Sequence, residues 1–335
     1  YGLFRKRIET IQGVKVYRAL LFPRLNGSGL FLALNYLSWA FFASIWAIVL
    51  ALFNHYDSII VHETSPITQG IPAVLVKKIR KIPIYFWVLD LWPESLVSAG
   101  GVKNKTVIKV FTKLTAFLYR ESHKILISSK GFKKSILEKG DFKDRIVYFP
   151  NWAEDVFTAE TFLKKDKIPD LPKGFRVMFA GNIGEAQDFE SIMEAALLLR
   201  KREEVKFLFV GDGRKKKWLD SFIEENSLEK TCITYGRYPL TTMPLFFKDA
   251  YVMLVTLKDE LIFNLTVPAK IQAYMASGKP ILTMLNGEGS SLIKESGCGL
   301  TAKAGDYRRL SYNIESLLRK DEVELESFGS KGATF

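Results

Sequence analysis

The sequence predicts an α/β protein of two domains, on three observations. The chain has 335 residues, which is about twice the length of an ordinary domain. Short runs of β-branched and aromatic residues alternate in both halves with longer segments of helical character, as in parallel sheets covered on both faces. Between the halves, residues 150–173 contain three prolines, which is typical of a linker.

Each expected strand is a short apolar run. In the first half the runs lie near residues 14–20, 58–62, 83–88, 124–128 and 145–149. In the second half they lie near residues 175–180, 205–210, 231–235, 251–255 and 280–285. This series predicts an N-terminal domain over residues 1–152, a linker over 153–172, a C-terminal domain over 173–320 and a tail over 321–335.

The excess of positive charge lies in the first half of the chain. The net charge is +12, and residues 1–150 alone hold 22 Lys and Arg against 9 Asp and Glu. Such an excess predicts that the N-terminal domain faces an anionic surface or substrate. Nucleic acid is the competing partner, but no nucleic-acid-binding motif accompanies the charge, so no nucleic acid is expected. Anionic lipid suits the sequence better, because an apolar segment lies in the same half.

That apolar segment covers residues 30–53, whose only polar residues are Asn35, Ser38 and Ser44. Its length would span a bilayer, which takes about 20 residues. A helix buried against a sheet, or lying in the membrane interface, would have the same composition, and the chain continues at once into an expected strand. We expect a buried or interfacial helix, with a membrane span as the alternative. No signal peptide is expected at the start of the chain.

Metal and disulfide chemistry find no support in the sequence. The two cysteines, Cys232 and Cys298, have no partner at metal-ligand spacing, and so few thiols suit a reducing compartment. The three histidines are scattered, and no two aspartates have the Asp-x-Asp spacing that would clamp a metal on a diphosphate. We therefore expect neither a metal nor any other cofactor.

Three strands of the second half end in glycine, which predicts a nucleotide site there. The segments are FAGNIG at residues 179–184, FVGDG at 209–213 and TYGR at 234–237. Ligands of open parallel sheets lie beyond the carboxyl ends of the strands, where glycine lets the backbone approach closely. Free N–H groups of the turn at residues 181–184 would meet a diphosphate. A plain tight turn would also account for these glycines.

Lys270 is the expected cation of that site. The segment TVPAK, residues 266–270, places Pro268 at the start of a helix that Gly278 ends. Lys270 then lies near the helix N-terminus, at the same edge of the sheet, where it would stabilise a leaving diphosphate. A solvated lysine on a surface helix is the alternative.

Two acids of the first half are candidates for the acceptor side. Asp90 and Glu94 belong to the segment DLWPES, residues 90–95, which follows an expected strand. They would receive a proton from the acceptor hydroxyl or orient a sugar. Glu94 would alternatively cap the helix that follows.

The motifs in this order resemble family 4 glycosyltransferases. They are DLWPES, residues 90–95; PNW, 150–152; GNIG, 181–184, with Gln187; GDG, 211–213; and VPAK to GKP, 267–280. Within the family the chain is similar to the branch of colanic-acid and O-antigen enzymes and N-acetyl-L-fucosamine transferases. The similarity extends from about residue 35 to residue 318.

This resemblance implies a GT-B fold, in which two Rossmann-like domains face each other across a cleft. It implies a retaining, metal-independent hexosyltransferase that builds O-antigen, capsule or another surface polysaccharide. The donor would be a UDP-sugar, such as UDP-N-acetyl-L-fucosamine, and the acceptor a polyprenyl-diphosphate-linked sugar. The enzyme would lie on the anionic cytoplasmic face of the bacterial inner membrane, as a peripheral protein.

The resemblance also assigns residues. Asp90, Glu94 and Lys270 would be catalytic, with no metal. The donor would be bound by Gly181, Asn182, Ile183, Gly184, Gln187, Gly211, Asp212, Gly236, Arg237, Thr266, Val267, Pro268 and Lys270.

The chain departs from the family pattern at three places. Leu265 and Ala273 stand where many members have two glutamates, the second of which binds the ribose; Gln272 and Glu288 are both candidates for that role. Asn182 and Gln187 stand where other members have Arg and Lys, so that more of the charge compensation falls on Lys270 and Arg237. The family's opening strand and glycine-rich loop would precede Tyr1.

Two other functions are compatible with such a sequence. A sugar-nucleotide epimerase uses the same scaffold but needs no lipid surface. A catalytically silent membrane scaffold would have kept the fold and lost the nucleotide, as Leu265 and Ala273 allow. Thermal stabilisation by UDP separates the scaffold from the two enzymes. The transferred sugar, the linkage and the oligomeric state are not encoded in any motif found here.

Overall fold

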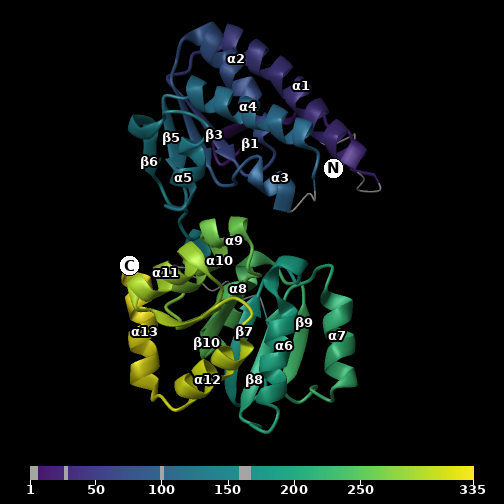
Figure 1. Cartoon of the computed structure of the whole chain (residues 1–335), viewed down its shortest axis with the longest axis vertical. Helices are drawn as coiled ribbons and strands as arrows, with labels where there is room; N and C mark the ends of the chain where they lie inside the picture. The colour runs from purple at the N-terminus through teal and green to yellow at the C-terminus, as the bar shows by residue number, and fades with distance from the viewer. Residues whose placement is uncertain (1–6, 26–28, 99–101, 158–166) are drawn as a thin grey trace. The chain divides into compact units, whose positions relative to one another are not determined.

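The computed structural model describes residues 7–25, 29–98, 102–157 and 167–335. The chain forms two compact units, residues 1–150 and 151–335 (Figure 1). Both units contain a parallel sheet with helices, so the predicted α/β class is confirmed.

The N-terminal unit contains a four-stranded sheet in the order β3-β4-β5-β6. All three strand pairs are parallel. The central strand β4 is a continuous apolar run with four of its five residues buried, as expected for a strand covered on both faces. The bounds are β3 Ile59–Glu63, β4 Ile84–Val88, β5 Lys124–Ile127, β6 Ile146–Tyr148, α1 Gly29–Phe53, η1 Ile67–Gln69, α2 Gly70–Arg80, α3 Glu94–Ser98, α4 Lys105–Glu121, α5 Phe132–Leu137 and η2 Lys143–Arg145.

The strand expected near residues 14–20 does not belong to this sheet. Residues Val14–Tyr17 form β2, which pairs antiparallel with β1, Ile8–Ile11, in a separate hairpin. The turn between them consists of Gln12 and Gly13, which both have positive φ angles of 49° and 82°. Two such residues form the tight turn that a two-residue hairpin requires, and this explains why the segment folds back on itself.

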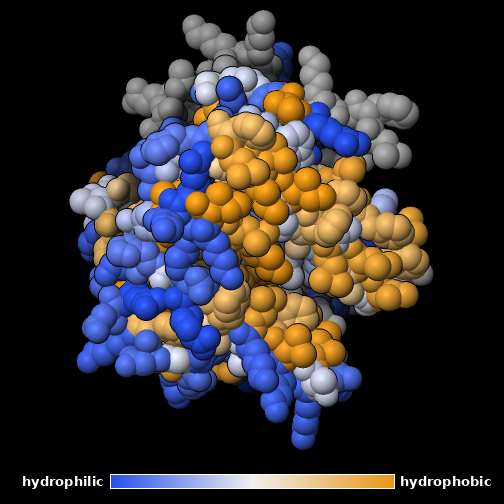
Figure 2. Space-filling model, turned by 90° about the horizontal axis from the view of Figure 1, so that it is seen from above, coloured by the Kyte–Doolittle hydropathy of each residue, from blue (hydrophilic) through white to orange (hydrophobic). Residues whose placement is uncertain are grey.

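Helix α1 contains the apolar segment, and it is mostly exposed. It packs against α2, but only Asn35, Ala40 and Ala51 are buried. Among the described residues, α1 alone is long and apolar enough to cross a membrane. The buried helix that was one of our expectations is therefore not observed, and a large apolar surface remains on this face of the unit (Figure 2).

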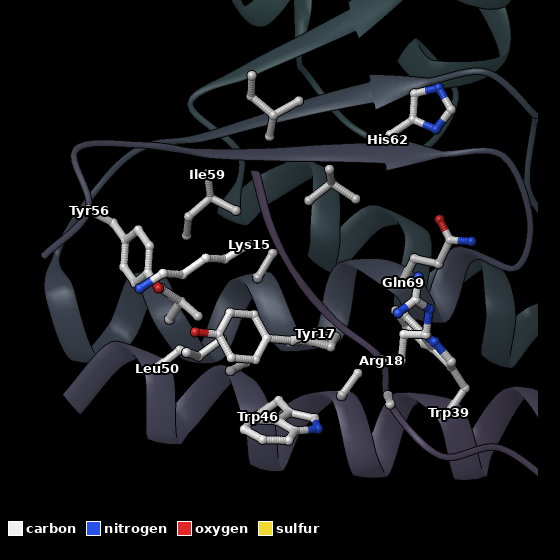
Figure 3. A pocket seen from close by; sticks show the side chains of 18 of the residues that line it. Lys15, Tyr17, Arg18, Trp39, Trp46, Leu50, Tyr56, Ile59, His62 and Gln69 are labelled. Atoms are coloured by element: carbon white, nitrogen blue, oxygen red, sulfur yellow. The ribbon is translucent and has the colours of Figure 1, made fainter. Parts of the chain in front are cut away.

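A cavity of about 1230 Å³ lies between α1, β2 and the edge of β3. Figure 3 shows Tyr17 of β2 and Trp46 of α1 side by side in it, and their ring centroids are 5.3 Å apart. Residues 58–62 all line this cavity, because β3 is hydrogen-bonded to a neighbouring strand on one side only. The cavity thus exposes the free edge of the sheet.

The C-terminal unit contains six parallel strands in the order β12-β11-β10-β7-β8-β9. The chain starts in the middle of the sheet at β7, moves to β9, and returns past β7 to β10. Strand order therefore reverses between β7 and β10. The bounds are η3 Asp155–Phe157, β7 Phe175–Ala180, η4 Glu185–Gln187, α6 Phe189–Leu198, β8 Val205–Val210, α7 Lys216–Glu225, β9 Cys232–Gly236, η5 Leu240–Thr242, α8 Met243–Asp249, β10 Val252–Thr256, α9 Leu261–Leu265, α10 Ala269–Ala276, β11 Ile281–Met284, α11 Gly287–Ser296, β12 Gly299–Ala302, α12 Tyr307–Leu318 and α13 Glu322–Thr334.

Each face of this sheet has its own hydrophobic core. Helices α6, α7 and α12 cover one face, where Phe189 and Leu310 are fully buried. Helices α8, α10 and α11 cover the other face, where Phe246 and Tyr274 are fully buried. This is the doubly wound arrangement predicted from the alternation of strands and helices.

Two elements of the C-terminal unit differ from the prediction. Strand β12 was not predicted. The expected tail, residues 321–335, is instead the helix α13, which begins with a capping box between Asp321 and Glu324 and packs against α10. Of the predicted linker, residues 158–166 lie outside the described residues, whereas Phe157 stacks on Phe247 of α8.

Candidate active site

The three glycine-ended strands are neighbours, and their ends lie close together. Gly181 N donates to Val210 O at 2.8 Å, and Gly211 N donates to Gly236 O at 2.7 Å. A Cβ atom on Gly211 would lie 1.8 Å from the Gly181 carbonyl oxygen, and both glycines have φ angles, 147° and 136°, that other residues rarely adopt. Glycine is therefore required for the backbones to approach this closely.

The turn after β7 has exposed residues that a ligand could contact and buried residues that hold the turn in place. Ile183 is fully buried, and its N–H donates to Asp212 O at 2.9 Å. Gly184 is buried against the amide of Asn182, while the Asn182 and Asp212 residues themselves are exposed. Of the predicted donor-binding residues of the two loops, Gly181, Asn182 and Asp212 are therefore exposed at the carboxyl edge of the sheet, whereas Ile183, Gly184 and Gly211 are buried.

Lys270 of α10 reaches this surface. Its Nζ donates to Gln187 Oε1 at 2.8 Å and lies 3.6 Å from the ring centroid of Phe179. A Cβ atom on Gly181 would lie 2.7 Å from Lys270 Cε, so the glycine makes room for the lysine. The predicted residues Gly181, Gln187 and Lys270 are therefore in contact, although they are up to 89 positions apart in the sequence.

The enclosure of the Lys270 ammonium has an electrostatic consequence. Loss of solvent lowers the pKa of Lys270 from 10.5 to about 7, because burial disfavours the charged form. The described surroundings offer it a carbonyl-type oxygen and an aromatic ring, and neither bears a negative charge. An anion placed beside it would therefore be strongly attracted and would hold the proton on the lysine.

The start of α10 is built as predicted, and its other residues have supporting contacts. Pro268 is the N-cap, Thr266 Oγ1 donates to Ile262 O at 2.8 Å, and Val267 packs on the hydrophobic core. These residues fix the position at which Lys270 enters the site. Arg237, by contrast, is exposed beyond Gly236.

The structure distinguishes the two candidates for ribose binding, Gln272 and Glu288. The Gln272 amide can donate to the carbonyl oxygens of Pro268 and Ala269 of its own helix, at 3.0 and 3.2 Å. Glu288 lies in the first turn of α11 and is only partly buried. Of the two candidates, Glu288 retains the carboxylate that could accept hydrogen bonds from a ribose.

In the N-terminal unit, Asp90 and Glu94 lie beyond the carboxyl end of β4. Ser95 Oγ donates to Asp90 Oδ1, and burial raises the pKa of Asp90 despite this hydrogen bond. Glu94 accepts from Ser135 Oγ at 2.5 Å and pairs with Lys139 Nζ at 2.7 Å. Glu94 thus connects α3 to α5, and both Asp90 and Glu94 are partly exposed.

Sequence reasoning missed Glu63, the last residue of β3. Glu63 is fully buried, and neither of its carboxyl oxygens has a hydrogen-bond partner. Burial, together with the nearby charge of Asp90, raises the pKa of Glu63 well above its usual range. Tyr119 is also fully buried, and its hydroxyl has no hydrogen-bond partner. Burial raises the pKa of this hydroxyl, and Tyr119 lies close enough to Glu63, Glu94 and Asp90 for their charges to raise it further. An acid at the end of a strand was the signal that had already selected Asp90.

The sequence is similar to those of known glycosyltransferases. Residues 174–320 match the family of glycosyl transferases group 1. The chain is 32% identical over 259 residues, 72% of its length, to a probable glycosyltransferase, WbjE, of Pseudomonas aeruginosa, of which it spans 62%. It is also 32% identical over 136 residues, 39% of its length, to a putative colanic acid biosynthesis glycosyl transferase, WcaI, of Escherichia coli, of which it spans 33%.

Solved structures share the fold. Anabaena HepE in complex with UDP and glucose has a TM-score of 0.65 and 15% identity, over 88% of this chain and 75% of HepE. Sucrose-phosphate synthase from Thermosynechococcus elongatus has a TM-score of 0.69 and 13% identity, over 99% of this chain and 81% of that one. The chain therefore has the GT-B fold, and its residues 174–320 are similar to the glycosyl transferases group 1 family.

Proposed function

We propose that this protein is a glycosyltransferase that takes a sugar from a UDP-sugar bound at the glycine-ended strands of the C-terminal unit. The observation that carries the proposal is the position of the Lys270 ammonium beside Gly181, in an enclosed site that favours an anion. The family match over residues 174–320 and the UDP bound by HepE support the same assignment.

The proposed reaction retains the configuration of the sugar and needs no metal. The bond between the sugar's anomeric carbon and the β-phosphate oxygen breaks, the acceptor oxygen bonds to that carbon from the same face, and the hydroxyl proton passes to the leaving phosphate. The backbone N–H groups of Asn182 and Gly184, together with Lys270, stabilise the charge that develops on the diphosphate, because those of Gly181 and Ile183 already donate to carbonyl groups of the protein. Asp90 orients the acceptor hydroxyl.

We propose that no metal is needed, because of the kinds of side chain that the structure groups together. Among the described residues no three His, Cys, Asp or Glu side chains are grouped so that they would hold a metal ion. The lysine and the backbone donors would then supply the charge compensation that a metal gives other enzymes. We expect EDTA to leave transfer unchanged, and a loss of activity that Mg²⁺ restores would refute this part.

The proposed acceptor is a sugar linked to a polyprenyl diphosphate, at the cytoplasmic face of a bacterial inner membrane. The exposed apolar surface of α1 would enter the interface, and the basic residues of the first 150 positions would attract anionic lipid. The relative WcaI is described as a colanic acid biosynthesis enzyme, which supports a role in surface polysaccharide synthesis.

Release of UDP tests the activity. UDP-N-acetyl-L-fucosamine is the first donor to try, followed by other UDP-sugars, each with and without a polyprenyl-diphosphate-linked sugar. We expect Lys270→Ala to lower turnover about 100-fold, the effect of removing a donor to the developing charge. Near-normal turnover in this variant would contradict the role of Lys270, and absence of UDP binding by the unaltered protein would contradict the proposed function itself.

Vesicle sedimentation tests the membrane proposal. Because the attraction is electrostatic as well as apolar, the protein should bind anionic vesicles more tightly than neutral ones, and salt should weaken the difference. Equal binding to both kinds of vesicle would exclude the electrostatic contribution.

A further inference from the structure

Lys258 stands at the point of the C-terminal sheet where a ligand is expected. It follows the end of β10 by two residues, and Gly181 follows the end of β7 by one. These two strands are neighbours, and the strand order reverses between them. Ligands of doubly wound sheets bind in the crevice beyond the carboxyl ends of the strands at such a reversal. Lys258 and the Gly181 turn thus lie on its two sides.

Lys258 and Lys270 both contact one short turn, η4. Lys258 Nζ pairs with Glu185, the first residue of η4, and Lys270 Nζ binds Gln187, the last. The two lysines thus bind the side chains at the first and last positions of the same three-residue turn. The Lys258 N–H also donates to Ala186 O at 3.0 Å, which fixes the lysine against the turn. Two ammonium groups that contact one short turn are a suitable arrangement for an anion with two linked phosphates.

The ion pair of Lys258 can be exchanged at little cost. The Glu185 side chain is 66% exposed and that of Lys258 is 29% exposed, and pairs this open to solvent add little to stability. Glu185 also contacts Lys215 Nζ at 3.2 Å. If Lys258 turns to another anion, the Glu185 carboxylate keeps Lys215 as its partner.

We propose that Lys258 is a second cation for the donor's diphosphate and that Glu185 is the counter-ion which the diphosphate displaces from it. The inference rests on the proposed function. It adds a cation to a turn whose own residues Asn182 and Gln187 are uncharged. It also gives the ion pair a role: Glu185 holds the Lys258 side chain at the site before the donor arrives.

Dissociation constants for UDP, measured by calorimetry on the full chain at low salt, test the proposal. Lys258→Met removes a charged donor and should raise the constant about 10-fold, whereas Lys258→Arg, which keeps the charge, should stay within about 3-fold of the unaltered protein. Glu185→Gln removes the competing carboxylate and should lower the constant about 2- to 5-fold. Lys320→Met is the matched control, because it breaks an exposed pair with Glu324 after α12 and should change nothing.

Two results would overturn the inference. One is UDP binding by Lys258→Met within 2-fold of the unaltered protein. The other is that Glu185→Gln weakens UDP binding as much as Lys258→Met does, because the pair would then merely hold the turn in shape. Either result, with UDP still bound by the unaltered protein, leaves the proposed function standing. Absence of UDP binding by the unaltered protein would instead refute the proposed function.

Discussion

The position of Lys270 disfavours the charged form of its ammonium group in the free protein. In a complex with UDP, the same position would favour that charge. Gly181, Phe179 and Gln187 shield its ammonium from water, and this shielding lowers its pKa to about 7. The same shielding strengthens its attraction to a phosphate, because water no longer screens the two charges. Function at this residue is therefore expected to depend on pH.

We predict that UDP binds more weakly as the pH rises above 7. Above its pKa the free Lys270 is neutral, and UDP must draw a proton onto it, so the affinity should fall by up to about 10-fold per pH unit. Calorimetry at pH 8 should also record proton uptake in buffers of different ionisation enthalpy.

The Lys270→Met variant is the control for this pH dependence. A methionine at this position cannot take up the proton. The variant should therefore bind UDP more weakly than the unaltered protein at pH 6.5, and its affinity should change less than that of the unaltered protein between pH 6.5 and 8.5. Any titration of UDP itself affects both proteins equally and cancels in their ratio. A ratio that does not change with pH would contradict the low pKa of Lys270.

Glu63 gives a prediction about stability. Its pKa is raised in the folded protein, so the stability that its neutral form allows is present below the unfolded pKa of about 4.3 and is lost as the pH rises towards the folded pKa. Glu63→Gln keeps the shape without the charge. Its melting temperature should therefore exceed that of the unaltered protein at pH 8 and converge with it near pH 4; a constant difference would contradict this account.

For single residues, the motifs of the sequence predicted which polar side chains belong to the site, but they did not predict which side chains these residues contact. Asp90 and Lys270 were found because one follows an apolar run and the other starts a helix. The pairing of Glu94 with Lys139 joins residues 45 positions apart, and the buried Glu63 has Asp90 and Tyr119 as neighbours, 27 and 56 positions away. Such contacts are set by tertiary packing, which no local pattern records.

Secondary structure elements were predicted best where both faces of a strand are buried. The runs at residues 175–180 and 205–210 have the same bounds as β7 and β8, because strands buried on both faces are largely apolar, and only Arg176 and Lys206 interrupt them. Strand β12 was missed because GLTA, its four residues, contains a glycine and a threonine. Helix α13 was missed because Gly329 and Gly332 lower its helix propensity.

The glycines of α13 have a packing role, which gives a second stability prediction. A Cβ atom on Gly329 would lie 1.9 Å from the Gly278 carbonyl oxygen, just after α10. Gly329→Ala should therefore push α13 away and destabilise the protein by about 2 kcal/mol, although alanine favours helices. Ser330→Ala, at an exposed position of the same helix, should change little. Thermal unfolding compares them, and equal melting temperatures would mean that α13 is not packed as described.

Helix α1 gives a prediction about the membrane. Leu37 and Phe41 lie one turn apart and are 60% and 63% exposed, so serine at both positions should leave the fold intact. Burial of each side chain in lipid is worth about 1.5–3 kcal/mol, and the double variant should bind vesicles at least 10-fold more weakly. Val110→Ser, which removes an exposed side chain from α4, is the control. Unchanged vesicle binding by the double variant would show that α1 does not enter the interface.

The whole molecule divides its proposed tasks between two units. Residues 1–150 contain the exposed apolar helix and the excess of positive charge, and they present Asp90 for the acceptor. Residues 151–335 contain the six-stranded sheet and the glycine-ended strands for the donor. The alternation of strands and helices predicted two α/β units, and the division of tasks between them stays a proposal. The donor sugar was not predictable, because its recognition depends on a few loop side chains.

The location of the diphosphate is the central claim, and a crystal structure of the full chain with UDP tests it most directly. We predict electron density for the two phosphates beside the turn at residues 181–184, with an oxygen within hydrogen-bond distance of Lys270 Nζ. UDP bound at the opposite edge of the C-terminal sheet, or in the N-terminal unit, would contradict the account.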